Sequence, residues 1–252
     1  ILNVGRMSLT VMFFTLLTCF GGGYFIGRAL GLDWKLSNLI SAGTGICGGS
    51  AIAAVAPVID AKDSDIAYAL SATFLFDMAM IVLFPIMGRA MGLSDMAYGL
   101  WAGTAVNDTS SVVAAGYAFS EGAGDFATMV KLTRTLAIIP ITLVLAFVRT
   151  KRAKTDGTKV NFKKIFPMFI LYFLLASVIT TICVSAGVSA SVFTPLKTLS
   201  KFLIVMAMCA VGLNTNIVKL VKTGGKPLIM GFCCWVGIAG MSLLMQHVLG
   251  IW

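Results

Sequence analysis

The feature that most constrains this chain is a succession of long apolar stretches separated by short polar ones. Eight stretches of about 20 residues fit along its 252 residues, and a helix needs about that length to cross a bilayer. Charged residues make up 12% of the chain, against about 25% in a soluble domain. We therefore predict an all-α membrane protein with one transmembrane domain, 1–252, in contact with the lipid bilayer, and we do not expect a soluble enzyme.

The predicted bundle has about eight transmembrane helices joined by short loops. Their ranges are near 8–30, 36–58, 65–91, 96–119, 126–148, 166–186, 194–213 and 227–251. Residues 1–6 have the pattern of a loop entering a helix, and the first residue is not Met. We therefore expect that an N-terminal part of the protein is absent from this chain.

Lysine and arginine are distributed unevenly between the two sides of this predicted bundle. Alternate loops place 13 of the 19 basic residues on one side and four on the other. Because basic residues are enriched in cytoplasmic loops, the loop 149–164 is predicted to be cytoplasmic, and both chain ends are predicted to face outward. The net charge of +9 is then a topology signal. Nucleic-acid binding is not expected, because the basic loop lacks interleaved aromatic residues.

The predicted second helix contains a run of glycines in its middle. Residues 43–50 read GTGICGGS, which places four glycines among eight residues. Glycine costs a helix about 1 kcal/mol per residue, and a broken helix directs N–H groups at a central site that suits an anion. The candidate binding residues here are Thr44, Cys47, Gly48, Gly49 and Ser50. Close packing of helices through small residues is an equally consistent interpretation.

The predicted fourth helix contains five consecutive polar residues at mid-span, which are Asn107, Asp108, Thr109, Ser110 and Ser111. These residues cover every side of a helix, so local unwinding or a polar cavity is the simplest arrangement. Ionisable residues at that depth are candidates for function. We favour a ligand-binding role over a purely structural hydrogen-bond cluster.

The two unusual segments resemble each other at an offset of 60 residues. The tripeptide Ala-Gly-Thr at 42–44 recurs at 102–104, and Ser50 and Ala54 recur as Ser110 and Ala114. Corresponding interrupted segments in two halves of a chain indicate a transporter binding site. Because one predicted helix separates the segments, simple spanning makes them parallel rather than inverted.

Four charged residues lie within the predicted spans, and their charges sum to zero: Asp77, Asp108, Lys131 and Arg134. Lys131 and Arg134 share one helix face, and the planar guanidinium of Arg134 suits a sulfate, sulfonate or carboxylate. Pairing of Arg134 with Asp77 or Asp108 is equally consistent, and Lys131 has the alternative of reaching the interface. Asp77 is a candidate for proton coupling or for an ion pair.

Cysteine and histidine do not indicate a metal or catalytic centre. All six cysteines lie in apolar runs without CxxC spacing, as expected for small buried residues: Cys19, Cys47, Cys183, Cys209, Cys233 and Cys234. His247 is the only histidine, so we predict no multi-histidine metal site, no cofactor and no Ser-His-Asp triad.

The segments GTGICGGSAIAAVAPVI and LWAGTAVNDTSSVVAAG, followed by VKLTR, together resemble the YeiH-type family of bacterial inner-membrane proteins. That family is usually described as sulfate exporters of unproven substrate. The resemblance covers nearly the whole chain and implies a secondary-transporter fold with inverted repeats and interrupted helices that cross at mid-membrane. Family members are longer at the N-terminus by roughly three helices. Two residues depart from the family pattern: Asn107 stands where His is common, and Asp77 where Asn is frequent.

Our leading hypothesis is a secondary transporter of a small anion, sulfate- or sulfonate-like, in the bacterial cytoplasmic membrane. Under this hypothesis we expect no enzymatic activity. The expected partners are the small anion and, in a possible homodimer, a second copy of the protein. An anion channel is the first alternative. An intramembrane enzyme using Ser50 or Cys47 with Asp108 ranks last, because no histidine base is available, and a non-transporting membrane protein is a further alternative.

Overall fold

The computed structural model describes residues 2–155, 168–187, 189–193, 195–196, 199, 202, 206 and 225–251. Within these residues the chain is helical and forms no strand, which confirms the predicted all-α bundle. Four helical stretches of this described part are long and apolar enough to cross a membrane, namely Ser8–Ala29, Asp63–Ala90, Glu121–Lys151 and Gly225–Val248. Their lengths and hydropathy explain why they form the frame of the bundle.

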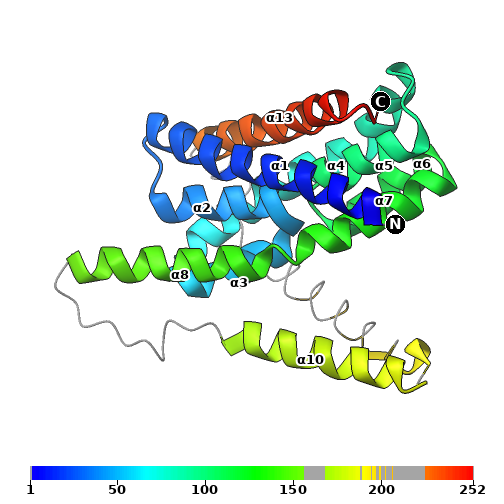
Figure 1. Cartoon of the computed structure of the whole chain (residues 1–252). Coiled ribbons are helices and arrows are strands. Elements are labelled where there is room, and N and C mark those ends of the chain that lie inside the picture. The colour runs from blue at the N-terminus through cyan, green and yellow to red at the C-terminus, as the bar shows by residue number, and fades with distance from the viewer. Residues whose placement is uncertain are drawn as a thin grey trace.

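The frame consists of long helices that run past one another (Figure 1). They are α1 (Leu2–Ala29), α4 (Asp63–Ala90), α7 (Glu121–Thr135) continued by α8 (Ile138–Thr155), and α13 (Gly225–Val248). The predicted fifth helix is thus two helices, with a break at 136–137. Pro140 lies in the first turn of α8, where a missing N–H costs no helical hydrogen bond.

The predicted second helix turns back on itself and forms a hairpin. It consists of α2 (Trp34–Ala42), a π-helical turn at Gly43–Cys47, and α3 (Gly49–Ile59). The ammonium of Lys35, at the start of α2, donates a 2.6 Å hydrogen bond to the carbonyl of Asp60, just after α3. Both outer ends therefore lie at the same face. Arms of 9 and 11 residues are about 14 and 17 Å long, roughly half of a 30 Å hydrocarbon core.

The predicted fourth helix forms a second hairpin, from α5 (Asp95–Ala105) and α6 (Thr109–Phe119). The rings of Tyr98 and Phe119 stack with centroids 3.9 Å apart. The Tyr98 hydroxyl donates to the Ala115 carbonyl at 2.9 Å, so the start of α5 lies beside the end of α6. This segment also enters and leaves at one face.

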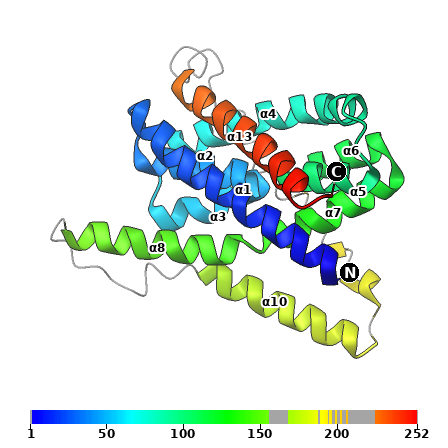
Figure 2. The ribbon, with the colours of Figure 1, turned by 45° about the horizontal axis from the view of Figure 1, so that its top comes forward.

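The two hairpins enter from opposite faces, because α4 crosses the bundle between them (Figures 1 and 2). The prediction that these segments span the membrane in parallel was wrong, and two of the eight predicted passes are re-entrant. The physical reason lies in the break of each segment. Gly48 adopts a φ of +69° in the first segment, and Val106 and Asp108 are extended in the second, so neither helix continues straight through its break.

One end of the bundle is strongly basic, and we call it the basic face. Eight described basic residues lie at helix ends there: Arg28, Lys35, Lys62, Arg149, Lys151, Arg152, Lys154 and Lys226. Arg6 and Arg89 lie toward the opposite face, where both chain termini are found (Figure 1). The hairpins move Lys62 and Arg89 to the sides opposite to those predicted, yet the asymmetry of charge remains.

The C-terminal half contains the least described part of the chain. The sixth predicted helix corresponds to α10 (Met168–Ser185), which lies below the other helices in Figure 1. A short 3-10 helix follows at Ala190–Phe193. The seventh predicted helix, 194–213, and loop residues 156–164 lie mostly or wholly outside the described residues. The eighth corresponds to α13.

Candidate functional site

The tips of the two hairpins meet near the middle of the frame helices, and we call this region, 44–50 and 106–110, the junction. A Cβ built on Gly48 would lie 3.2 Å from the Asp108 Cβ and 3.3 Å from its Cα. Gly48 also has a φ of +69°, a conformation that other residues rarely adopt. Glycine is therefore required both by the turn and by the close approach of the second hairpin.

Lys131 of α7 connects both tips. Its ammonium, fully buried, donates hydrogen bonds to the Ile46 carbonyl at 2.8 Å and to the Val106 carbonyl at 3.0 Å, and also to the carbonyl of Asn107. These carbonyls are freed where the helices are interrupted. A cation at a helix C-terminal end is favourable, because unpaired carbonyls give that end a partial negative charge.

Arg134, one turn further along α7, also donates hydrogen bonds to the carbonyls of both tips. Its Nε donates to the Gly45 carbonyl at 2.7 Å, its Nη2 to the Thr44 carbonyl at 2.8 Å, and its Nη1 to the Val106 carbonyl at 3.2 Å. The side chain is fully buried. Anion binding and aspartate pairing were the two interpretations open from sequence. The structure shows a third arrangement, in which the guanidinium binds the hairpin backbones.

Asp77 holds the second tip from the other side. Its Oδ1 accepts the backbone N–H groups of Asn107 at 3.0 Å and Asp108 at 3.1 Å. Asp77 is the middle residue of α4, which places this tip at mid-membrane depth. Asp108 in turn begins α6, because its Oδ2 accepts from the backbone N–H of Ser110 at 2.9 Å and from the Ser110 hydroxyl.

Two buried polar groups at the junction have no hydrogen-bond partner among the described residues. They are Oδ2 of Asp77, which is 2% exposed, and both amide atoms of Asn107, which is fully buried. An unsatisfied buried polar group costs about 1–3 kcal/mol, so such atoms mark places where a ligand, a proton or water is accommodated.

The hydroxyl groups of the junction differ in exposure. Ser50 and Ser110, in the first turns of α3 and α6, are exposed, Thr109 is half-buried, and Thr44 and the adjoining Ser111 are buried. Ser50 donates to the Cys47 carbonyl at 2.9 Å. No side chain caps the N-terminus of α3 within the part of the chain that is described. The exposed hydroxyl side chains of the junction are therefore Ser50 and Ser110, and the uncapped N–H groups belong to the same helix end as Ser50.

The predicted site residues thus have two kinds of position. Gly48, Gly49, Ser50, Asp108, Thr109 and Ser110 lie at the meeting point of the hairpins, while Lys131, Arg134 and Asp77 support it from α7 and α4. Sequence reasoning missed the contribution of α13, whose Ser242 hydroxyl is 2.7 Å from that of Thr104 on α5. Arg89 and Arg149 were predicted from the sequence only as charges of the loops that set the topology.

Comparisons with known proteins agree on one family. The model of the family described as conserved hypothetical protein 698 matches residues 1–231. A UPF0324 membrane protein of Clostridium tetani is 53% identical over 264 residues, covering 99% of this chain and 75% of the relative. UPF0324 membrane proteins of Streptococcus pyogenes and Streptococcus mutans are 53% and 52% identical, each covering 100% of this chain and 76% of the relative. No solved structure matches.

Proposed function

The chain belongs to the conserved hypothetical protein 698 family, whose members similar to it are UPF0324 membrane proteins, and from that premise we propose that it is a secondary transporter of a small anion. The observation that supports this most strongly is the pair of re-entrant hairpins that enter from opposite faces and meet at mid-membrane.

The hairpins favour alternating access. Each hairpin separates the junction from one face, so movement of one hairpin gives access from that face while the other keeps the second face closed. Irregular backbone at membrane depth is tolerated only where protein or a water-filled cavity satisfies it, and here Lys131, Arg134 and Asp77 do so. Such devices are typical of transporters with inverted repeats.

The junction favours an anion for two reasons. The N-terminus of α3 points into it without a side-chain cap, and backbone N–H groups at such an end attract negative charge. Lys131 and Arg134 lie behind the tips and add positive charge, although their donors bond to backbone carbonyls. Sulfate and sulfonates carry acceptor oxygens that match these N–H groups and the hydroxyls of Ser50 and Ser110.

The proposal includes the bacterial cytoplasmic membrane as location, with the basic face in the cytoplasm, where basic residues are enriched. A homodimeric state and the absence of enzymatic activity remain predictions of the sequence.

The test is transport by the full-length protein in proteoliposomes with radiolabelled sulfate and taurine. We expect counterflow, and we expect Ser50→Ala and Ser110→Ala each to raise KM about three- to tenfold, the equivalent of one hydrogen bond. Ser64→Ala, at an exposed position in the first turn of α4, serves as the matched control and leaves KM unchanged. Absence of counterflow for both anions, beside a working reference transporter, would contradict the proposal, and unitary current steps would favour a channel.

A further inference from the structure

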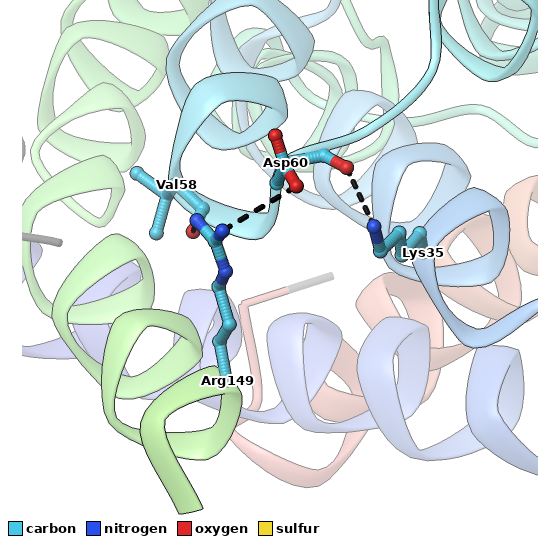
Figure 3. Close-up of polar contacts among 4 residues, drawn as sticks. All are labelled: Lys35, Val58, Asp60 and Arg149. Carbon is cyan, nitrogen blue, oxygen red and sulfur yellow. Dashed lines mark hydrogen bonds and ion pairs between the residues drawn. The ribbon is translucent and has the colours of Figure 1, made fainter. Parts of the chain in front are cut away.

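The outer end of the first hairpin is held by an arginine from a distant helix (Figure 3). Arg149, near the end of α8, donates from Nη1 to the Val58 carbonyl at 3.0 Å, and its Nη2 lies 3.5 Å from Oδ2 of Asp60. The Lys35 ammonium donates to the Asp60 carbonyl at 2.6 Å. Three elements, α2, α3 and α8, are thereby joined at the basic face.

The outer end of the second hairpin is held in the same way at the opposite face. Arg89, at the end of α4, donates from Nη2 to the Ala118 carbonyl at 2.7 Å. Its guanidinium carbon lies 5.9 Å from the centroid of the Phe119 ring, which stacks on Tyr98. Arginine at the C-terminal end of a helix satisfies free carbonyls and opposes their negative charge.

These two contacts are related by the same offset that relates the hairpin tips. Arg149 follows Arg89 by 60 residues, and the acceptor Ala118 follows Val58 by 60 residues. Each long helix therefore leaves the outer end of one hairpin and ends at the outer end of the other. The two donors are separated by 60 residues, and so are the two acceptors. The contact is therefore a repeated part of the architecture rather than an isolated capping interaction.

The tip and the outer end of each hairpin are held differently. Lys131 and Arg134 bond to the tips from fully buried positions. At the outer end of the first hairpin the side chains of Arg149 and Asp60 are 30% and 74% exposed. Water and salt reach the outer contact, so it is the weaker of the two.

We propose that Arg149 and Arg89 are positioning residues that each hold one hairpin closed, and that release of one of them opens the junction to that face alone. The proposal rests on the proposed transport function, which it deepens by naming the two gates. The gates differ in chemistry. The contact at the basic face consists of charged and polar groups, while the opposite one adds aromatic packing, so salt weakens the basic-face gate more.

The experiment measures access to Cys47 at the first tip, which is 1% exposed. Cys47 is kept as the only cysteine of the full-length protein, and a membrane-impermeant methanethiosulfonate reagent is applied to right-side-out or inverted vesicles. We expect Arg149→Ala to raise the labelling rate about tenfold from the basic face only, as for the loss of a charge-assisted hydrogen bond. We expect Arg89→Ala to do so from the opposite face only. Each variant is thus a control for the other.

A further control is Arg28→Ala, an exposed arginine of the basic face whose guanidinium bonds to Tyr24 of its own helix, and it leaves labelling unchanged. Should Arg149→Ala fail to fold, Asp60→Asn is the substitute, because it weakens the ion pair but keeps the bond from Arg149 to Val58. We expect it to give a smaller increase in the labelling rate from the same face. Equal labelling from both faces, or no increase in folded variants, overturns the inference. Labelling needs no substrate, so one-sided gating without anion counterflow would refute the proposed substrate and leave the gates in place.

Discussion

Lys131 and Asp77 bind the same short turn, 106–108, one through its carbonyls and the other through its N–H groups, and no ion pair joins the two side chains. Asp77 accepts the N–H groups of Asn107 and Asp108, while Lys131 donates to the carbonyl of Asn107. Breaking a helix frees carbonyls at one end and N–H groups at the other. The ammonium of Lys131 binds the carbonyls, and the carboxylate of Asp77 binds the N–H groups. The charges of Lys131 and Asp77 are therefore linked through the backbone of the second hairpin.

Replacement of Lys131 by Met is expected to destabilise the protein more than loss of a single contact. The apolar side chain leaves the Ile46 and Asn107 carbonyls without the Lys131 donor, while the Val106 carbonyl keeps its bond from Arg134. Each unsatisfied buried group costs about 1–3 kcal/mol. Thermal unfolding of the detergent-purified variant should show a large fall in Tm. Leu132→Met, at the exposed neighbouring position, is the control. An unchanged Tm for Lys131→Met would contradict the role given to this ammonium.

Arg134→Gln is expected to lower stability by roughly 3 kcal/mol or more, because three carbonyls lose their guanidinium donors. Arg134→Lys should recover part of this loss, since an ammonium reaches fewer carbonyls than a planar fork. A second substitution, Asp77→Asn or Asp108→Asn, should give no rescue, because neither carboxylate depends on Arg134 for a partner. Rescue by either would instead show that a buried ion pair links them. Expression and Tm of single and double variants measure this.

Gly48→Ala is expected to cost about 1–3 kcal/mol, through the backbone strain of a residue held at positive φ and the contact of a new Cβ with Asp108. Gly21→Ala is the matched control, because a Cβ at Gly21 meets nothing within 4 Å. In a helix the control substitution is neutral or stabilising. Equal Tm values for the two variants would show that the tips are not in contact.

The interruptions themselves could be predicted from the sequence. The four glycines of 43–50 and the polar run 107–111 break a helical pattern by composition alone, and the structure has a break in each segment. The offset of 60 residues was also visible, at 42–44 and 102–104. These features depend on neighbours in the chain, which is why local reasoning was sufficient.

The direction after each break could not be predicted. A straight interrupted helix and a hairpin have the same length and composition, and what separates them are contacts such as Lys35 with Asp60 and Tyr98 with Phe119. Hydrophobic periodicity carries no information on such pairs. The partners of Lys131 and Arg134 were missed for a related reason. A broken helix frees N–H groups, which were predicted to bind an anion, but it also frees carbonyls, which need a donor equally.

The hairpins make a topological prediction that simple spanning helices do not. Single cysteines at the exposed positions Arg28 and Lys62 flank the first hairpin, and cysteines at Asp95 and Glu121 flank the second. In a cysteine-free background, Arg28→Cys and Lys62→Cys should react with an impermeant maleimide only after the cells are opened. Asp95→Cys and Glu121→Cys should react in intact cells, because the basic face is placed in the cytoplasm.

Thr155→Cys, at the end of α8, marks the basic face in the same experiment and should follow Arg28→Cys. If the first segment crossed the membrane, Lys62→Cys would instead react from the side opposite to Arg28→Cys, and the hairpin would be refuted whichever way the bundle is oriented. If all five positions exchanged sides together, the hairpins would stand and only the orientation would be reversed. The comparison within each pair therefore tests the fold, and the comparison with intact cells tests which hairpin faces the cytoplasm.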